Sequence, residues 1–146
     1  YKIRFIPHNN MLQQLPDFTK NDQVEFAKGS VLYREEFNHC SLLVTDYSSV
    51  FFDVSYLKKP IVYCQFDRDT FFEGQIYDKG YFDYEKDGFG PVCFDVDKTV
   101  DQIIKYIDQK CVVEKKYLQR IEAFYKYKDK NNCKRIYNAI EKINNK

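Results

Sequence analysis

The sequence lacks the features that would place it in a membrane or outside the cell. None of its 146 residues belongs to an apolar run approaching the roughly 18 to 20 residues that a membrane-spanning helix requires. No charged and apolar leader opens the chain, which begins at Tyr1 without a methionine. We therefore expect a soluble, cytoplasmic protein and a fragment cut from a longer chain.

Two nucleotide-binding motifs and a strong net charge are also missing. Neither the Gly-x-x-x-x-Gly-Lys-Ser loop nor Gly-x-Gly-x-x-Gly occurs, which disfavours P-loop NTPases and ordinary dinucleotide oxidoreductases. The formal net charge is only +1, so the chain as a whole does not attract nucleic acid. Nucleic acid is not expected as a partner.

The cysteines form no paired framework. They are five in number and at least 18 residues apart, a pattern that fits neither a disulfide scaffold nor a zinc site. We expect them to be reduced and mostly buried: Cys40, Cys64, Cys93, Cys111 and Cys133.

The residues that are present predict one α/β domain over residues 1–146. Apolar residues make up 44% and aromatic residues 18% of the chain, enough for one core. Strands are predicted at 1–7, 23–27, 61–64 and 91–94, and the continuous apolar run at 41–45 predicts a central strand covered on both faces.

Helices are predicted between and after these strands. Helical spacing occurs over 32–40 and again from Ser48 to Lys59-Pro60, where proline ends the helix. Three more helices over 96–146 are expected to pack against the sheet. Alternating strands and helices predict a Rossmann-like parallel sheet with helices on both faces, and the long segment 66–92 is expected to be functional.

Two serines stand where the predicted central strand meets its helix. Ligands of open α/β sheets bind beyond the carboxyl ends of strands, where helix starts offer free N–H groups, so Ser48 and Ser49 suit a phosphate. Asp53 lies four residues on and faces the same side of the helix. The alternative is that Asp46 or Ser48 only caps the helix.

His8 follows the first predicted strand and is the candidate functional histidine. An imidazole at the sheet edge can contact phosphate or move a proton near neutral pH. The alternative is a hydrogen-bonded turn residue after Pro7. His39, on the predicted helix 32–40, is expected to be structural.

Three ordered elements resemble the CDP-glycerol glycerophosphotransferases, the teichoic acid polymerase and primase family. The first is the run 43–53, Leu-Val-Thr-Asp-Tyr-Ser-Ser-Val-Phe-Phe-Asp, followed by Lys59-Pro60-Ile61. The second is 79–85, Lys-Gly-Tyr-Phe-Asp-Tyr-Glu, with Gly90-Pro91, and the third is His8 at the family's usual distance before Ser48.

The resemblance implies a two-domain GT-B transferase of which this chain is the C-terminal, donor-binding half. In such enzymes CDP-glycerol lies between the halves, and a polymer hydroxyl attacks its β-phosphorus and releases CMP. The implied partners are CDP-glycerol or a related CDP-polyol, a polyol-phosphate polymer and the missing N-terminal half. The family generally invokes no metal, and no cofactor is expected.

The resemblance also assigns roles by position. Ser48 and Ser49 would hold the pyrophosphate, Asp53 would help to fix the donor, and His8 would contact phosphate or assist the leaving group. The likelier base is a histidine of the absent half. Lys79 replaces the arginine common in the family, which keeps the charge but loses bidentate phosphate geometry.

The end of the chain is basic. Residues 115–146 carry ten lysines and arginines against three acidic residues, and such a segment can meet anionic lipid or the phosphates of the polymer. The chain is thus expected in the cytoplasm or on the inner face of the cell membrane. The alternative is a solvated helix face whose apolar stripe packs on the core.

Two other functions fit the same sequence. A GT-B glycosyltransferase that uses a nucleotide sugar would share the fold, and a noncatalytic nucleotide- or polymer-binding module would share the binding residues. We expect the chain alone to bind donor without turning it over, because the cleft needs both halves.

Overall fold

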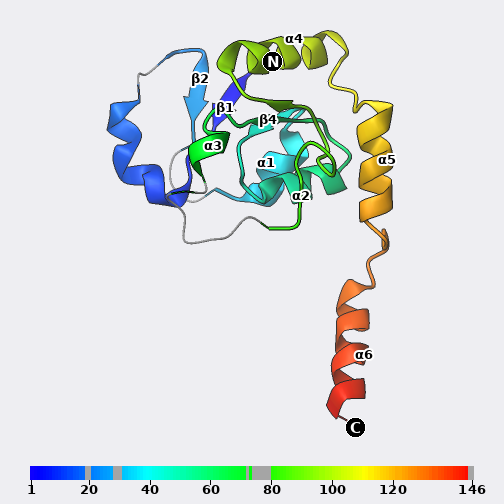
Figure 1. Ribbon diagram of the computed structural model, residues 1–146. Coiled ribbons are helices and arrows are strands. Elements are labelled where there is room, and N and C mark those ends of the chain that lie inside the picture. The colour runs from blue at the N-terminus through cyan, green and yellow to red at the C-terminus, as the bar shows by residue number, and fades with distance from the viewer. Residues whose placement is uncertain (19–20, 28–30, 72, 74–79, 145–146) are drawn as a thin grey trace. The chain divides into compact units, whose positions relative to one another are not determined.

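The computed structural model describes residues 1–18, 21–27, 31–71, 73 and 80–144. Its residues form two compact units, Tyr1–Cys40 and Ser41–Lys146. Strands and helices alternate in both units and every strand pair is parallel, so the predicted α/β class is confirmed (Figure 1). Within the described residues, no helix combines the length and the apolar character needed to span a membrane.

The first unit is built on two parallel strands. β1 (Ile3–Phe5) pairs with β2 (Val24–Phe26), and the 3₁₀ helix η1 (Asn9–Asp17) lies in the connection that parallel strands require. The rings of Phe5, Phe18 and Phe26 pack at centroid distances of 5.3 to 6.2 Å. Helix α1 (Tyr33–His39) ends the unit. The two strands and the helix predicted here are confirmed.

The second unit holds a three-stranded parallel sheet of order β3-β4-β5. Its strands are β3 (Leu43–Thr45), β4 (Ile61–Cys64) and β5 (Val92–Cys93). The prediction that residues 41–45 form the central strand is wrong for this sheet. β4 is central and its first three residues are wholly buried, whereas β3 lies at the edge and leaves Val44 42% exposed. An apolar run identifies a strand, but long-range pairing decides its position in the sheet.

Helices cover both faces of this sheet, as predicted. α2 (Val50–Tyr56) packs Phe51 against the ring of Tyr63 at 5.2 Å, while α4 (Val96–Asp108) places Tyr106 in a buried cluster with Val62 and Cys93. Side chains alternate along a strand, so neighbouring residues of β4 face opposite helices. Figure 1 shows α4 and α2 on the two sides of the sheet.

Helix α2 ends at a backbone motif as well as before a proline. Lys58 adopts a left-handed conformation with φ 55°, the N–H of Lys58 donates to Ser55 O at 2.8 Å, and the N–H of Lys59 donates to Val54 O at 3.3 Å. This pair of bonds is a Schellman motif, which satisfies the last carbonyls of a helix. The predicted stop before Pro60 is therefore confirmed, with an additional cause.

An aromatic cluster joins the loop after β4 to the helices. That loop contains the short helix α3 (Arg68–Phe71), and its Phe82 and Phe89 rings lie against Phe52 of α2 and Phe124 of α5 (Lys115–Phe124). The hydroxyl of Tyr125 donates to Phe52 O at 2.6 Å. These contacts fix α5 against α2.

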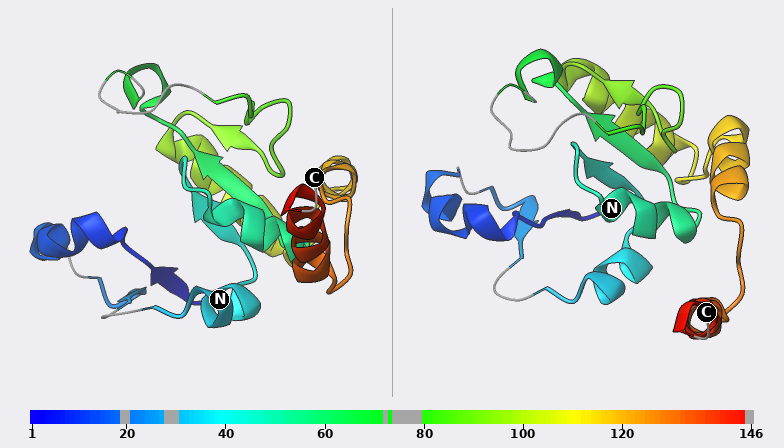
Figure 2. Two further views of the ribbon diagram at one scale, coloured as in Figure 1. Left: turned by 90° about the horizontal axis from the view of Figure 1, so that it is seen from below. Right: turned by 60° about the horizontal axis from the view of Figure 1, so that its bottom comes forward.

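The last helix does not pack as predicted. α6 (Asn132–Asn144) buries none of its residues, and it lies apart from the sheet in Figure 1 and in the right view of Figure 2. Its Ile136, Ile140 and Ile143 are 60%, 51% and 72% exposed. An amphipathic pattern predicts a helix with an apolar face, but it does not say that the chain itself covers that face.

The cysteines are less buried than predicted. No disulfide joins the five cysteines, all of which the structure describes, but only Cys93 is buried, and Cys133 on α6 is exposed. The thiol of Cys93 lies in the cluster between β4 and α4, where burial raises its pKa. The other three are half-buried.

Candidate functional site

The predicted serine segment lies at the carboxyl edge of the second sheet. β3 and β4 run parallel in the register Thr45 to Tyr63, so the segments that follow them leave the same edge. Residues 46–49 follow β3, and residues 65–68 follow β4. This is the edge where ligands of open α/β sheets bind.

The hydroxyls of Ser48 and Ser49 are available to a ligand. Ser48 is half-buried and Ser49 is exposed. Ser49 occupies the N-cap position of α2 but makes no side-chain capping bond, and neither hydroxyl hydrogen-bonds to the part of the chain that the structure describes. The alternative that Ser48 caps the helix is therefore wrong.

Asp46 supplies the local hydrogen bond instead. Its Oδ1 accepts the N–H of Ser48 at 3.1 Å, a turn that leads the chain into α2. That N–H is engaged, so the two hydroxyls are among the donors that this segment offers to a ligand. Asp53, also exposed, lies in the first turn of the same helix.

Three side chains from elsewhere fix residues Asp46 and Tyr47. The hydroxyl of Tyr84 donates to Tyr47 O at 3.1 Å, and Gln65 Nε2 donates to Asp46 O at 3.4 Å. The Tyr47 hydroxyl donates to Asp67 Oδ1 at 3.2 Å. Burial, with the negative charge of Asp67 adding to it, raises the pKa of Tyr47, so this hydroxyl stays protonated and remains a donor.

The sequence did not identify these supporting residues. Gln65, Asp67 and Tyr84 lie 16 to 36 residues beyond the serines. The sequence signals were indirect: Gln65 and Asp67 come just after a predicted strand, where polar side chains reach the carboxyl edge, and Tyr84 lies in the 79–85 element that resembles the family.

His8 lies in the first unit and takes part in a turn. It is exposed and forms the N-cap of η1, where its Nδ1 accepts the N–H of Asn10 at 3.2 Å. This bond leaves Nε2 as the ring nitrogen for other contacts. His39 on α1 is bonded to Glu35 O through Nδ1 at 2.8 Å, consistent with a structural role. Contact between His8 and the donor stays a prediction.

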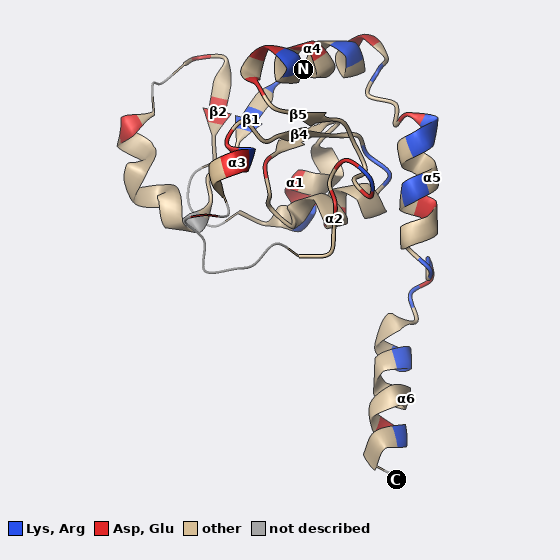
Figure 3. Ribbon diagram, viewed as in Figure 1, with Lys and Arg blue, Asp and Glu red and all other residues tan. Residues whose placement is uncertain are grey.

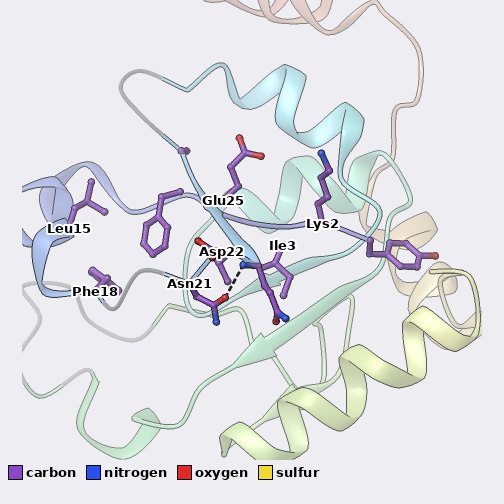
Figure 4. Close-up of a pocket in the computed structure, with 12 residues that line it drawn as sticks. Lys2, Ile3, Leu15, Phe18, Asn21, Asp22 and Glu25 are labelled. Carbon is purple, nitrogen blue, oxygen red and sulfur yellow. Dashed lines mark hydrogen bonds between the residues drawn. The ribbon is translucent and has the colours of Figure 1, made fainter.

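The first unit also carries a groove of about 1130 Å³. Figure 4 shows it along the β1–β2 sheet, with Ile3, Leu15 and Phe18 among its apolar lining and the carboxylates of Asp22 and Glu25 nearby. None of the four predicted site residues lines it. Its acidic groups do not suit a diphosphate, so the groove is not a candidate donor site.

Two further points concern metal ligands and Lys79. No group of three or more histidine, cysteine and carboxylate side chains suited to a metal occurs among the described residues. Lys79, the residue that replaces a family arginine, lies outside those residues.

Comparison with known proteins decides the family. The sequence model of the family described as CDP-Glycerol:Poly(glycerophosphate) glycerophosphotransferase matches residues 1–142. The chain belongs to this family. The resemblance carried by the serine segment and its two companion elements is thereby confirmed.

The relatives of this chain are teichoic acid proteins. It is 43% identical over 145 residues to the minor teichoic acid biosynthesis protein GgaB of Bacillus subtilis (strain 168), a match that covers 99% of the chain and 16% of GgaB. It is 39% identical over 71 residues to the teichoic acid poly(glycerol phosphate) polymerase of the same strain, which covers 48% of the chain and 9% of that polymerase. No solved structure gives a significant match.

A third relative makes a different polymer. The teichoic acid poly(ribitol-phosphate) polymerase of Bacillus spizizenii (strain ATCC 23059 / NRRL B-14472 / W23) is 34% identical over 86 residues, which is 59% of the chain and 12% of that protein. The chain thus spans less than a fifth of the length of each of these relatives. Its relatives include proteins named for two different polyols.

Proposed function

We propose that this chain binds the CDP-activated donor in the transfer of glycerol phosphate, or another polyol phosphate, to a growing teichoic-acid-like polymer. The observation that carries the proposal is the pair of hydroxyls on Ser48 and Ser49, which have no protein partner among the described residues and follow a strand at the ligand-binding edge. The family match supports this choice of donor. The domain is proposed to be the C-terminal half of a GT-B fold, over residues 1–146.

The chemistry is a phosphoryl transfer. A hydroxyl of the polymer forms a bond to the β-phosphorus of CDP-glycerol, the bond from that phosphorus to the bridging oxygen breaks, and CMP leaves with the electron pair. The hydroxyl proton passes to a base from the other half of the enzyme. Such reactions depend mainly on positioning and on stabilising charge on oxygen, which hydroxyl donors provide.

Each predicted residue has a proposed role in this step. Ser48 and Ser49 donate hydrogen bonds to the diphosphate, and Asp53 helps to orient the donor. His8 contacts phosphate or stabilises the charge that develops on the leaving CMP. The polyol is left open in the proposal because the relatives are named for both glycerol phosphate and ribitol phosphate polymers.

Calorimetry distinguishes this donor from the alternatives. We expect the chain to bind CDP-glycerol and CMP weakly and to bind UDP-glucose less well, because the proposed donor is a cytidine nucleotide. A preference for UDP-glucose would favour a GT-B glycosyltransferase that uses a nucleotide sugar. Donor binding without CMP release, measured after the chain is combined with its N-terminal half and polymer, would favour a noncatalytic binding module.

The basic end of the chain is proposed to contact anionic lipid. The solvated alternative assumed that the apolar stripe packs on the core, yet α6 buries no residue. Figure 3 shows blue lysine or arginine segments and a red acidic segment on an α6 ribbon that is otherwise tan, and Ile136, Ile140 and Ile143 of this helix are exposed. Positive charge next to an apolar stripe complements an anionic membrane surface, where each basic residue contributes about 1 kcal/mol.

A vesicle assay tests the lipid contact. We expect the chain to sediment with phosphatidylglycerol vesicles and not with phosphatidylcholine vesicles. Replacing Lys134 and Lys142 on α6 by glutamate should weaken binding at least about tenfold, because charge reversal removes two attractions of about 1 kcal/mol each. The same change at exposed Lys2 and Lys86 is the matched control and should have little effect. Equal binding by all variants would exclude this role for α6.

A further inference from the structure

The loop over residues 83–90 is a tightly closed turn. Asp83 O accepts the N–H of Asp87 at 2.6 Å, and Asp87 Oδ2 accepts the N–H of Asp83 at 2.9 Å. A Cβ on Gly88 would lie 2.0 Å from Tyr84 O, so the backbone approaches itself more closely than any other residue allows. These contacts restrain the backbone of the turn and so fix the direction in which the Tyr84 side chain projects.

Arg120 fastens this loop to α5. Its Nη1 donates to Glu85 O at 3.1 Å and to Gly88 O at 2.8 Å, and its guanidinium lies 5.6 Å from the centre of the Tyr117 ring. Arg120 is half-buried, and a planar guanidinium can serve two carbonyls at once. The guanidinium of Arg120 thus binds backbone carbonyls of the 83–90 loop and holds the loop against α5.

Tyr84 connects the 83–90 loop to the segment that contains the two serines. Its ring packs against Tyr63 at 5.1 Å and Phe51 at 5.7 Å, and its hydroxyl donates to the carbonyl of Tyr47 at 3.1 Å. Burial raises the pKa of Tyr84, so the hydroxyl remains a donor. Tyr47 directly precedes Ser48, so this bond restrains the backbone from which both serines project.

We propose that Tyr84 is a positioning residue for Ser48 and Ser49, and that Arg120 keeps Tyr84 in place. The inference rests on the proposed function, in which the serines bind the donor diphosphate. Short side chains such as serine hydroxyls have little reach, so their usefulness depends on a fixed backbone. The tether at Tyr47 supplies that fixed backbone before any ligand arrives.

Amide hydrogen exchange and calorimetry together test the tether. The Tyr84→Phe variant removes only the hydroxyl, and we expect the N–H of Ser48, which is bonded to Asp46 Oδ1, to exchange about fivefold faster in the ligand-free chain. Affinity for CDP-glycerol should fall by about the same factor, with an almost unchanged melting temperature. Arg120→Ala should speed exchange in both the 83–90 loop and the serine segment, and Arg120→Lys should restore part of the protection.

Matched controls are available on α6. Tyr137→Phe and Arg135→Ala make the same chemical changes outside the tether and should leave exchange at the serines unchanged. Unchanged exchange in Tyr84→Phe would overturn the positioning role, and so would faster exchange with unchanged affinity. If the wild-type chain binds no CDP-glycerol while Tyr84→Phe still exchanges faster, the tether is supported and the proposed function is the part that fails.

Discussion

Replacing Ser48 and Ser49 together by alanine is expected to reduce affinity for CDP-glycerol at least about 100-fold. Hydrogen bonds to charged groups contribute about 1.5 to 3 kcal/mol each, and two of them would be lost. The fold should survive, because neither hydroxyl bonds to the part of the protein that the structure describes. Calorimetry measures the affinity, and circular dichroism with a thermal melt measures the fold.

A third serine provides the control for this result. Ser41 is exposed and precedes β3 at the end opposite the proposed site, so Ser41→Ala should bind CDP-glycerol as the wild-type chain does. If the double variant kept wild-type affinity, the two hydroxyls would not be the diphosphate contacts. A double variant that lost binding and also melted much earlier would point instead to a structural role for the serines.

The Gly90→Ala variant is expected to lower the free energy of unfolding by about 3 kcal/mol or more. A Cβ at this buried position would lie 1.8 Å from Ile61 O and 2.7 Å from Ile61 C. Both are backbone atoms at the start of β4, the central strand of its sheet, so the neighbour cannot rotate away as a side chain would. Overpacking of this kind typically costs about 1 to 3 kcal/mol, and a rigid backbone neighbour places Gly90 at the upper end.

Gly80→Ala is the matched control for Gly90→Ala. A Cβ there would meet no atom within 4 Å, so the free energy of unfolding should change by less than about 0.5 kcal/mol. Urea denaturation monitored by circular dichroism gives both values, and we expect the melting temperature of Gly90→Ala to fall by about 10 °C. Equal stability of the two variants would show that the β4 backbone can move away from this position.

The local pattern of the chain predicted most of its elements. The strands over β1, β2, β4 and β5 and the helices α1, α2, α4, α5 and α6 lie where periodicity placed them, with ends shifted by a few residues. Local signals suffice for this because side-chain direction repeats every two residues in a strand and every 3.6 in a helix. The nine-residue helix η1 was not predicted, since a short, polar 3₁₀ turn has no such period.

The errors concern partners that lie far along the chain. Val44 belongs to an edge strand of its sheet, and Ile140 belongs to a helix face that this chain leaves exposed. Both side chains are apolar and look like core residues in the sequence. Which surface covers an apolar side chain depends on contacts between distant segments, and these contacts leave no periodic signal.

By itself, the sequence determined the α/β class, the family and the place of Ser48 and Ser49 at the end of a strand, because each of these depends on neighbouring residues or on a short ordered motif. Only the tertiary structure decided that β4 is the central strand of its sheet, that Tyr84 bonds to the Tyr47 carbonyl, and that Arg120 bonds to the 83–90 loop. These pairings join residues about 18 to 37 positions apart, and only the folded backbone brings them within hydrogen-bonding distance.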